Sequence, residues 1–277
     1  MSSSSADGSA PQRIIKIRRD YNTWVADETL EDYALRYTPK TMRKWSAFRV
    51  ANTAFGAVSF LAMEAIGASI ALNYGFSNAF VAICVVSLII FLTSLPISYY
   101  AARYGVDMDL LTRGAGFGYI GSTLTSLIYS SFTFIFFAIE AAIMALALEL
   151  FTGLPLYLGY LVSSLVIIPL VLRGITLINK LQAWTQPVWL FLLILPYAAV
   201  LYQKPGIIQD TLNFSGKFGQ APEFNVLMFG AACTVMFALV AQVGEQVDYL
   251  RFLPEKTPQN KAQWYGALLS AGPGWIV

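Results

Sequence analysis

The 277-residue chain has no histidine, only two cysteines and few charged residues. Without histidine, Ser-His-Asp and Cys-His catalysis and histidine-ligated metals are excluded. Cys84 and Cys233 both fall in apolar runs, which indicates small core residues rather than a disulfide framework or a metal site. Charged residues make up 12% of the chain, about half of the usual share in a soluble domain. Together these deficits exclude a soluble enzyme, a nucleic-acid-binding protein and a disordered chain.

Long apolar runs fill most of the chain instead. Because a helix needs about 20 apolar residues to cross a bilayer, the sequence predicts an all-α membrane protein that crosses the membrane several times. Seven segments qualify, the last only in part: Ala51–Asn73, Asn78–Tyr100, Tyr119–Phe151, Leu154–Leu172, Leu181–Tyr202, Val226–Val247 and Ala262–Val277. The third is longer than an upright span needs, so we expect it to be tilted or to extend beyond the bilayer.

The polar start of the chain differs from the remainder. We expect residues 1–49 to form an N-terminal extension, disordered at its Ser/Gly/Ala-rich beginning, and residues 50–277 to form the transmembrane domain. The apolar stretch still continues at Val277, so we expect the first part of a larger membrane protein.

The positions of the basic residues predict an orientation. Nine of the 18 Lys and Arg residues precede residue 50, and an inside N-terminus puts sixteen on the cytoplasmic side, against only Lys204 and Lys217 outside. Basic residues favour cytoplasmic loops. We therefore expect a multi-pass protein of the plasma or inner membrane with a cytoplasmic N-terminus. The lipid bilayer is then an expected partner, and nucleic acid is not.

Three acidic residues lie inside the predicted spans: Glu64 in the first, Glu140 in the third and Glu245 in the sixth. A charge at this depth costs at least about 2.5–3.5 kcal/mol, so each needs a reason. One interpretation is a protonated, hydrogen-bonded core carboxyl in each case. The other is a shared polar cavity, which would favour cations or protons over anions.

Glycines accompany the acids in two of these spans. Gly67 follows Glu64 in the first span, and Gly244 lies beside Gln242 and Glu245 in the sixth. In transporters, interrupted helices expose backbone groups to the substrate and the coupling ion. We therefore expect helix breaks at Gly67 and Gly244, although close packing through small residues is the alternative.

Three loop motifs carry a resemblance to a known family. Tyr104-Gly105, Leu111, Arg113, Phe117-Gly118 and Gly121 resemble the pattern YG…L-x-R-x-x-x-FG-x-x-G. Gly174, Ile178, Leu181, Trp184 and Pro187 match G-x-x-x-I-x-x-L-x-x-W-x-x-P without a gap, and Asp248-Tyr249-Leu250-Arg251 resembles D-Y-x-R. In these motifs the chain is similar to the nucleobase:cation symporter-1 family, which includes cytosine, allantoin and hydantoin permeases.

The resemblance implies a fold of about twelve helices built as a five-plus-five inverted repeat, like the leucine transporter, of which this chain holds helices one to seven. It also implies a substrate site that includes helices one, three and six. On helix three, Phe136 takes the position of the family's stacking tryptophan and Glu140 that of its hydrogen-bonding amide. A phenylalanine still stacks, whereas a carboxyl group changes the donor pattern. A second stacking aromatic is expected near Phe237–Leu239.

The leading hypothesis is a secondary transporter that couples a cation to a nucleobase or a related small planar nitrogenous compound. We expect the substrate to bind Phe136, Glu140, Gln242 and Glu245. We expect Glu64 and Gly67 to bind the ion or to couple the proton, with Na⁺ or H⁺ as the coupling ion and no other cofactor. The alternative is a transporter-like sensory module of a signalling protein, fused for example to a histidine kinase. A membrane enzyme is the weakest hypothesis, because no catalytic constellation is present.

Overall fold

The computed structural model describes residues 37–40, 43–219 and 222–275. Within these ranges the chain is helical and has no strand beyond an isolated bridge between Tyr37 and Val106. The expected disordered beginning of the chain lies outside the described residues.

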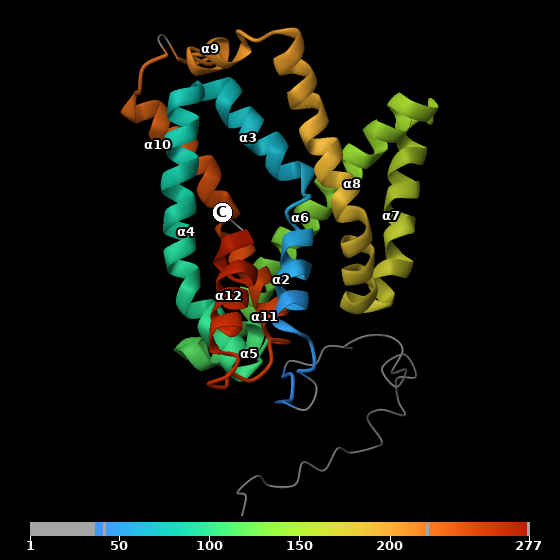
Figure 1. Cartoon of the computed structure of the whole chain (residues 1–277), viewed down its shortest axis with the longest axis vertical. Helices are drawn as coiled ribbons and strands as arrows, with labels where there is room; N and C mark the ends of the chain where they lie inside the picture. The colour runs from blue at the N-terminus through green and yellow to red at the C-terminus, as the bar shows by residue number, and fades with distance from the viewer. Residues whose placement is uncertain (1–36, 41–42, 220–221, 276–277) are drawn as a thin grey trace, which may run out of the picture.

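The helices form an elongated bundle (Figure 1). In chain order they are α2 (Ala47–Gly56), α3 (Leu61–Tyr74), α4 (Phe76–Tyr104), α5 (Met108–Thr112), the π-helix η2 (Arg113–Phe117), α6 (Gly118–Thr152), α7 (Leu156–Leu172), α8 (Gly174–Gln203), α9 (Ile207–Leu212), α10 (Val226–Phe237), the 3₁₀ helix η3 (Ala238–Gly244), α11 (Glu245–Leu250), α12 (Lys261–Ala271) and the 3₁₀ helix η4 (Pro273–Trp275).

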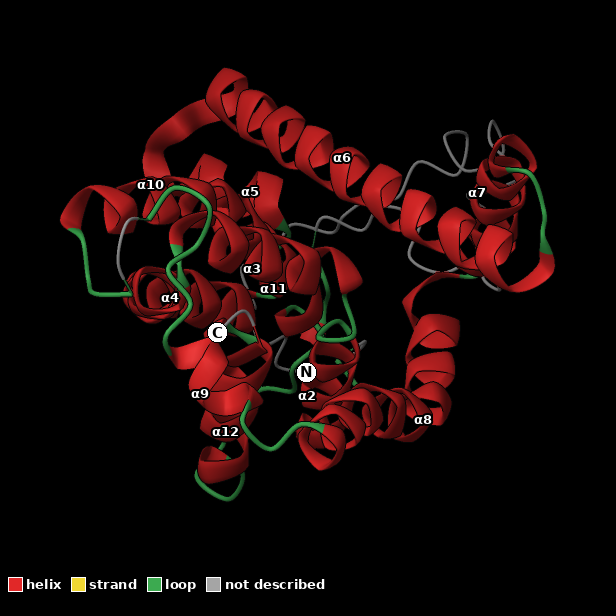
Figure 2. Cartoon of the chain, turned by 90° about the horizontal axis from the view of Figure 1, so that it is seen from above, coloured by secondary structure: helices red, strands yellow, loops and turns green. Residues whose placement is uncertain are grey.

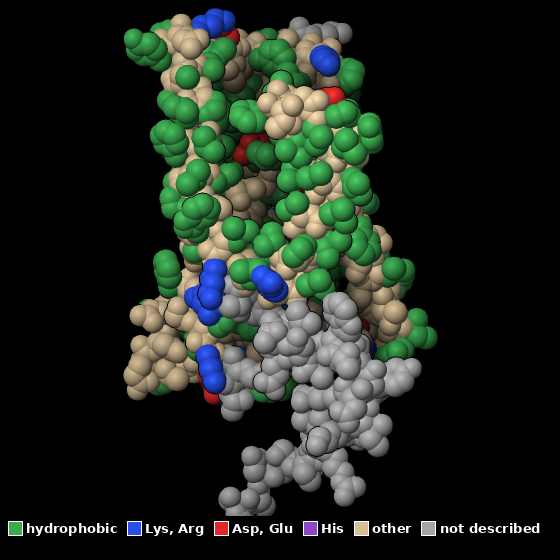
Figure 3. All heavy atoms as spheres, turned by 90° about the vertical axis from the view of Figure 1, so that its right-hand side faces the viewer, with side chains coloured by type: hydrophobic (Ala, Val, Ile, Leu, Met, Phe, Trp, Pro, Cys, Tyr) green, Lys and Arg blue, Asp and Glu red, His purple; other side chains and the backbone are tan. Residues whose placement is uncertain are grey.

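Each of the seven predicted spans contains a helix, but the described helices differ in length. Four are long and apolar enough to cross a membrane, and the bent pair α2 and α3 can form a fifth span. The apolar α7 has 17 residues and α12 has 11. Figure 3 shows hydrophobic side chains over the middle of one face and basic side chains at its two ends, as a membrane-spanning bundle requires.

The first span is interrupted between α2 and α3, whose axes differ by 53°. The break expected at Gly67 is wrong, because Gly67 lies inside α3 and the interruption is at residues 57–60. Here the Ser59 hydroxyl donates to the Gly56 carbonyl at 2.9 Å, and the Phe60 amide bonds to Val58 instead of continuing the helix. A serine side chain that competes for a backbone carbonyl favours such a turn.

The sixth span stays helical throughout but changes its helix type. Residues Ala238–Gly244 form a 3₁₀ helix between α10 and α11, and Gly244 keeps helical angles (φ −62°, ψ −34°). The break expected at Gly244 is therefore a change of helix type. A Cβ atom at this glycine would lie 2.8 Å from the Tyr129 ring, so the glycine allows α6 to approach closely.

The two modified spans run in opposite directions. In Figure 1 the chain rises from α2 to α3 and descends from α10 to α11. The helix that follows each of these spans packs against the first helix of the other span: α4, which follows the first span, lies along α10, and α12, which follows the sixth, lies along α2. This arrangement is that of an inverted repeat.

The third span is the longest helix of the bundle. At about 1.5 Å per residue, the 35 residues of α6 extend about 52 Å, well beyond a bilayer core of about 30 Å. Seen from above, α6 runs obliquely across the bundle and α7 packs beside its far end (Figure 2). The third span is thus a single long helix, inclined to its neighbours in the bundle.

The loop between α4 and α6 begins and ends with glycines of positive φ. Gly105 has a φ of 67° and Gly118 a φ of 66°, conformations that favour glycine. Arg113 pairs with Asp109 at 2.8 Å, whereas Asp107 caps α5 by accepting from the Leu110 amide. The loop motif thus forms a connection of defined conformation, stabilised by an ion pair and a helix cap.

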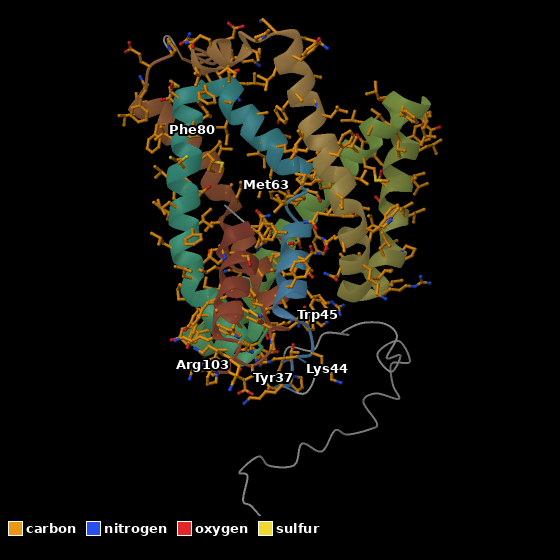
Figure 4. The ribbon with its side chains drawn as sticks, in the orientation of Figure 1. Tyr37, Lys44, Trp45, Met63, Phe80 and Arg103 are labelled. Atoms are coloured by element: carbon orange, nitrogen blue, oxygen red, sulfur yellow. The ribbon has the colours of Figure 1, made fainter. Side chains whose placement is uncertain are left out.

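Residues 37–40 and 43–46 fold against one end of the bundle, where Tyr37, Lys44, Trp45 and Arg103 appear in Figure 4. Trp45 stacks on Phe252 at 4.7 Å between ring centroids. The boundary predicted at residue 49 therefore falls inside α2, and these preceding residues belong to the folded bundle.

Arg43 holds this segment to the end of α4. Its buried guanidinium donates to the carbonyls of Thr38, Ala102, Arg103 and Tyr104, at 2.9, 3.2, 3.3 and 2.5 Å. Three of these carbonyls are at the C-terminus of α4, where helical partners run out and a positive charge is favourable. Burial lowers the pKa of Arg43 from its usual value, but a guanidinium stays charged in a protein.

Replacing Arg43 with alanine should lower the free energy of unfolding by about 3 kcal/mol, because several buried carbonyls lose a charged donor. Thermal unfolding of the detergent-solubilised protein measures this. Lys44→Ala is the matched control, since the neighbouring Lys44 side chain is exposed. Equal melting temperatures for the two variants would contradict the role of Arg43.

Candidate functional site

Two cavities meet at the interruption of the first span. The first, which we call the α4 cavity, has a volume of about 250 Å³. It lies between the interruption, α3, α4, α10 and η3, and Met63 of α3 appears in the middle of the bundle in Figure 4. Its lining residues are Ala57, Val58, Phe60, Met63, Ile66, Gly67, Ile83, Ser87, Met236, Leu239, Gln242 and Trp275.

The second cavity faces α8, and we call it the α8 cavity. It has a volume of about 510 Å³. Its lining residues are Thr53, Gly56, Ala57, Ser59, Phe60, Ile178, Gln182, Gln242, Glu245, Tyr249 and Trp275. Polar side chains are thus more frequent here than in the α4 cavity.

Four residues line both cavities: Ala57, Phe60, Gln242 and Trp275. Gln242 is 2% exposed and Trp275 is 6% exposed. The Gln242 Oε1 and the Trp275 Nε1 atoms have no hydrogen-bond partner among the described residues. Since buried polar atoms in proteins are almost always paired, these two atoms are candidates for binding a ligand.

The predicted stacking residue Phe136 lies behind the cavity rather than on its wall. It is buried against Ala62 and Leu239. Its ring lies 5.3 Å from that of Phe60, centroid to centroid, and Phe60 is the aromatic residue that lines both cavities. In this structure Phe136 therefore supports the aromatic surface that Phe60 presents.

Glu140 caps the broken helix. Phe60, the residue before α3, has no side-chain oxygen to cap the helix start. The Glu140 Oε1 atom, contributed by α6, accepts from the Ala62 amide at 2.7 Å. A helix N-terminus carries unpaired amides and a partial positive charge, so a carboxylate stabilises it. One Glu140 oxygen is thus engaged by the protein itself.

The other two predicted acids have surroundings that differ from those of Glu140. Glu64, in the first turn of α3, is exposed and close enough to Glu140 for an electrostatic interaction. Glu245 lines the α8 cavity and accepts from the Tyr249 hydroxyl at 2.5 Å. The three carboxylates do not line one cavity. Within the described residues, no group of three Cys, Asp or Glu side chains is suited to hold a metal ion.

The two predicted glycines have different surroundings. Gly67 lines the α4 cavity, and a Cβ atom there would meet nothing within 4 Å. Gly244 is buried against Tyr129 and lines neither cavity. Of the two, Gly67 is the one whose small size keeps space open.

Sequence reasoning missed Phe60, Gln182 and Trp275. Phe60 directly follows Ser59, a polar residue in an apolar run that begins after Gly56. This glycine and serine are the sequence signal for the interruption. Gln182 and Trp275 belong to α8 and η4, outside the helices that the family resemblance connects with the substrate. Only the folded arrangement brings them to the cavities.

Replacing Glu140 with leucine should lower the free energy of unfolding by about 1–2 kcal/mol, because the Ala62 amide loses its acceptor. Glu140→Gln, which keeps an amide oxygen, should cost less. Thermal unfolding in detergent measures both, and Glu149→Leu at the exposed end of the same helix is the control. A melting temperature of Glu140→Leu equal to that of the wild type would rule out the capping role.

One comparison with known proteins identifies a family. The sequence model of the family described as "Permease for cytosine/purines, uracil, thiamine, allantoin" matches residues 37–277. No curated protein and no solved structure matches significantly.

Proposed function

The chain belongs to the family of permeases for cytosine/purines, uracil, thiamine and allantoin, and from this premise we propose cation-coupled symport of a nucleobase or a related small planar nitrogenous solute. The family is one of transporters, not of enzymes. The solute binds at the interruption of the first span and is carried by alternating access of the bundle.

The observation that carries this proposal is the α4 cavity beside the interruption. Its volume of about 250 Å³ is that of about eight water molecules at about 30 Å³ each, which leaves room for a single-ring base, since covalently bonded ring atoms need less space than the same number of waters. Phe60 offers an aromatic face for a flat ring, and Gln242 and Trp275 offer unpaired polar atoms for its edge. An apolar pocket with a few polar groups is typical of a solute site.

The charge at the start of α3 favours neutral or cationic solutes. A helix N-terminus at a transporter interruption can attract an anionic group of the substrate. Here the Glu140 carboxylate already bonds to the Ala62 amide. A second anion would meet its negative charge and that of nearby Glu64, so anionic solutes are disfavoured.

The same two carboxylates support the coupling to a cation. Neither Glu64 nor Glu140 forms a salt bridge with a described residue. Like charges that lie close together attract Na⁺ or favour the uptake of a proton. Gly67, one turn from Glu64, lies on the α4 cavity, so ion and solute would bind near each other.

The orientation of the protein is part of the proposal. The concentration of basic residues before residue 50 supports a cytoplasmic N-terminus in the plasma or inner membrane. The end of the bundle that carries Lys44 and Arg103 (Figure 4) is then the cytoplasmic end.

Uptake by proteoliposomes tests the function directly. Labelled uracil, cytosine and allantoin are offered under an inward Na⁺ gradient and, separately, an inward proton gradient, and we expect at least one to accumulate under one gradient. Glu64→Gln and Glu140→Gln should each reduce gradient-driven uptake at least tenfold, because each removes a negative charge. Glu149→Gln, at an exposed position of α6, should leave uptake unchanged. Undiminished uptake in both test variants would exclude the two carboxylates from coupling.

Filling the α4 cavity provides a second test. Gly67→Val should reduce solute affinity at least tenfold, because its side chain enters the open space above the glycine. Gly230→Val is the matched control, since Gly230 also lies in a helix with open space around it and lines neither cavity. Equilibrium binding to the purified protein measures both. Equal affinities would show that the solute does not bind in the α4 cavity.

A further inference from the structure

We propose that the α8 cavity is a second binding station for the transported solute, in which Gln182, Gln242 and Trp275 bind a cyclic amide or ureide edge. The inference rests on the proposed function, because it assigns a second site to the same solute. It concerns α8, which contributes no residue to the lining of the α4 cavity.

Three buried polar atoms without a partner among the described residues carry the proposal. They are Oε1 of Gln182, Oε1 of Gln242 and Nε1 of Trp275, and all three side chains line the α8 cavity. A buried polar atom without a partner is costly, so such atoms need an explanation. Two acceptors and one donor around one space complement a ligand that offers N–H groups and a carbonyl. Cyclic amides and ureides present these groups side by side on a flat ring.

Gln182 reaches the cavity because α2 ends in a glycine. A Cβ atom at Gly56 would lie 2.5–2.8 Å from the side-chain carbons of Gln182. Any larger residue at position 56 would displace Gln182 from the cavity wall. The close approach of α8 to the interruption thus depends on this glycine.

Trp275 is held in place by an aromatic contact with α11. Its ring packs edge-on against Tyr249, with 5.7 Å between the centroids. The Tyr249 hydroxyl in turn donates to Glu245. The ring is thus fixed, whereas its indole N–H has no hydrogen-bond partner among the described residues. A fixed ring with a free donor is the arrangement expected of a binding group.

The second station lies on the route from the α4 cavity to the cytoplasm. Gln242 and Trp275 line both cavities, so a solute that moves from one to the other keeps contact with them. The α8 cavity adds α2 and α11, the halves of the two modified spans at the end of the bundle that carries Lys44 and Arg103. With a cytoplasmic N-terminus, the solute reaches this station after the α4 cavity.

Equilibrium dialysis of the purified protein with labelled uracil, cytosine and allantoin tests the proposal. The wild type should bind about two equivalents of the transported solute at saturation. Gln182→Leu alters only the α8 cavity and should bind one equivalent, as should Gly67→Val, which alters only the α4 cavity. Trp275→Phe removes the shared N–H and keeps a ring, so it should weaken both classes of site at least fivefold.

Matched controls separate these effects from misfolding. Gln186 lies about one turn further along α8 and lines a different groove, and the Trp184 side chain is 76% exposed. The variants Gln186→Leu and Trp184→Phe should therefore both bind two equivalents. Gln182→Asn keeps the amide but shortens its reach, and it replaces the leucine variant if that variant does not fold.

The outcomes are distinct. One equivalent in the wild type, or two equivalents in both Gln182 variants, overturns the second station and leaves the proposed function in place. A wild type that binds none of the three probes overturns the proposed function and the second station with it. Loss of one equivalent in Gln182→Leu but not in Gln186→Leu supports the station.

Discussion

The hydrogen bonding of the backbone at the interruption of the first span is the constraint on which the site depends. Inside a membrane, an unpaired backbone group has no water to replace its partner. At residues 57–60 the helix stops, and the protein supplies the partners itself: Ser59 bonds to the Gly56 carbonyl, and Glu140 accepts from the Ala62 amide. These two contacts stabilise an irregular turn at depth. They thereby leave Phe60 free of a regular helix, where its ring lines both cavities.

The oblique course of α6 follows from the same requirement. Only a helix that passes the interruption can bring Glu140 to the start of α3, and α6 contacts both α3 and η3. Small residues allow these approaches: Gly244 makes room for Tyr129 of α6, and Gly56 makes room for Gln182 of α8. The cavities thus exist because glycines let two other helices close around the turn, while a carboxylate from one of them caps it.

The contacts of Arg43 and Trp45 at one end of the bundle fix the segment before α2 relative to the helices that surround the site. Arg43 binds the last carbonyls of α4, and Trp45 stacks on Phe252 beyond α11. The segment before α2 is therefore attached both to the helix beside the α4 cavity and to the end of the sixth span. In the proposed transport cycle, any movement of α2 relative to the bundle has to preserve or break these contacts.

The sequence by itself determined the helical segments, the family and the unusual length of the third span, because run length and motif spacing are properties of neighbouring residues. It also identified Gln242 and Glu245 as residues that belong near a cavity. The tertiary structure decided what each buried group contacts. The break lies at residues 57–60 and not at Gly67, and Glu140 accepts from an amide 78 residues away. Phe60, rather than Phe136, lines the cavities, and Gln182 and Trp275 join the lining. These outcomes depend on the approach of segments distant in the chain, and helical periodicity alone carries no information about which distant segment will be opposite a given face.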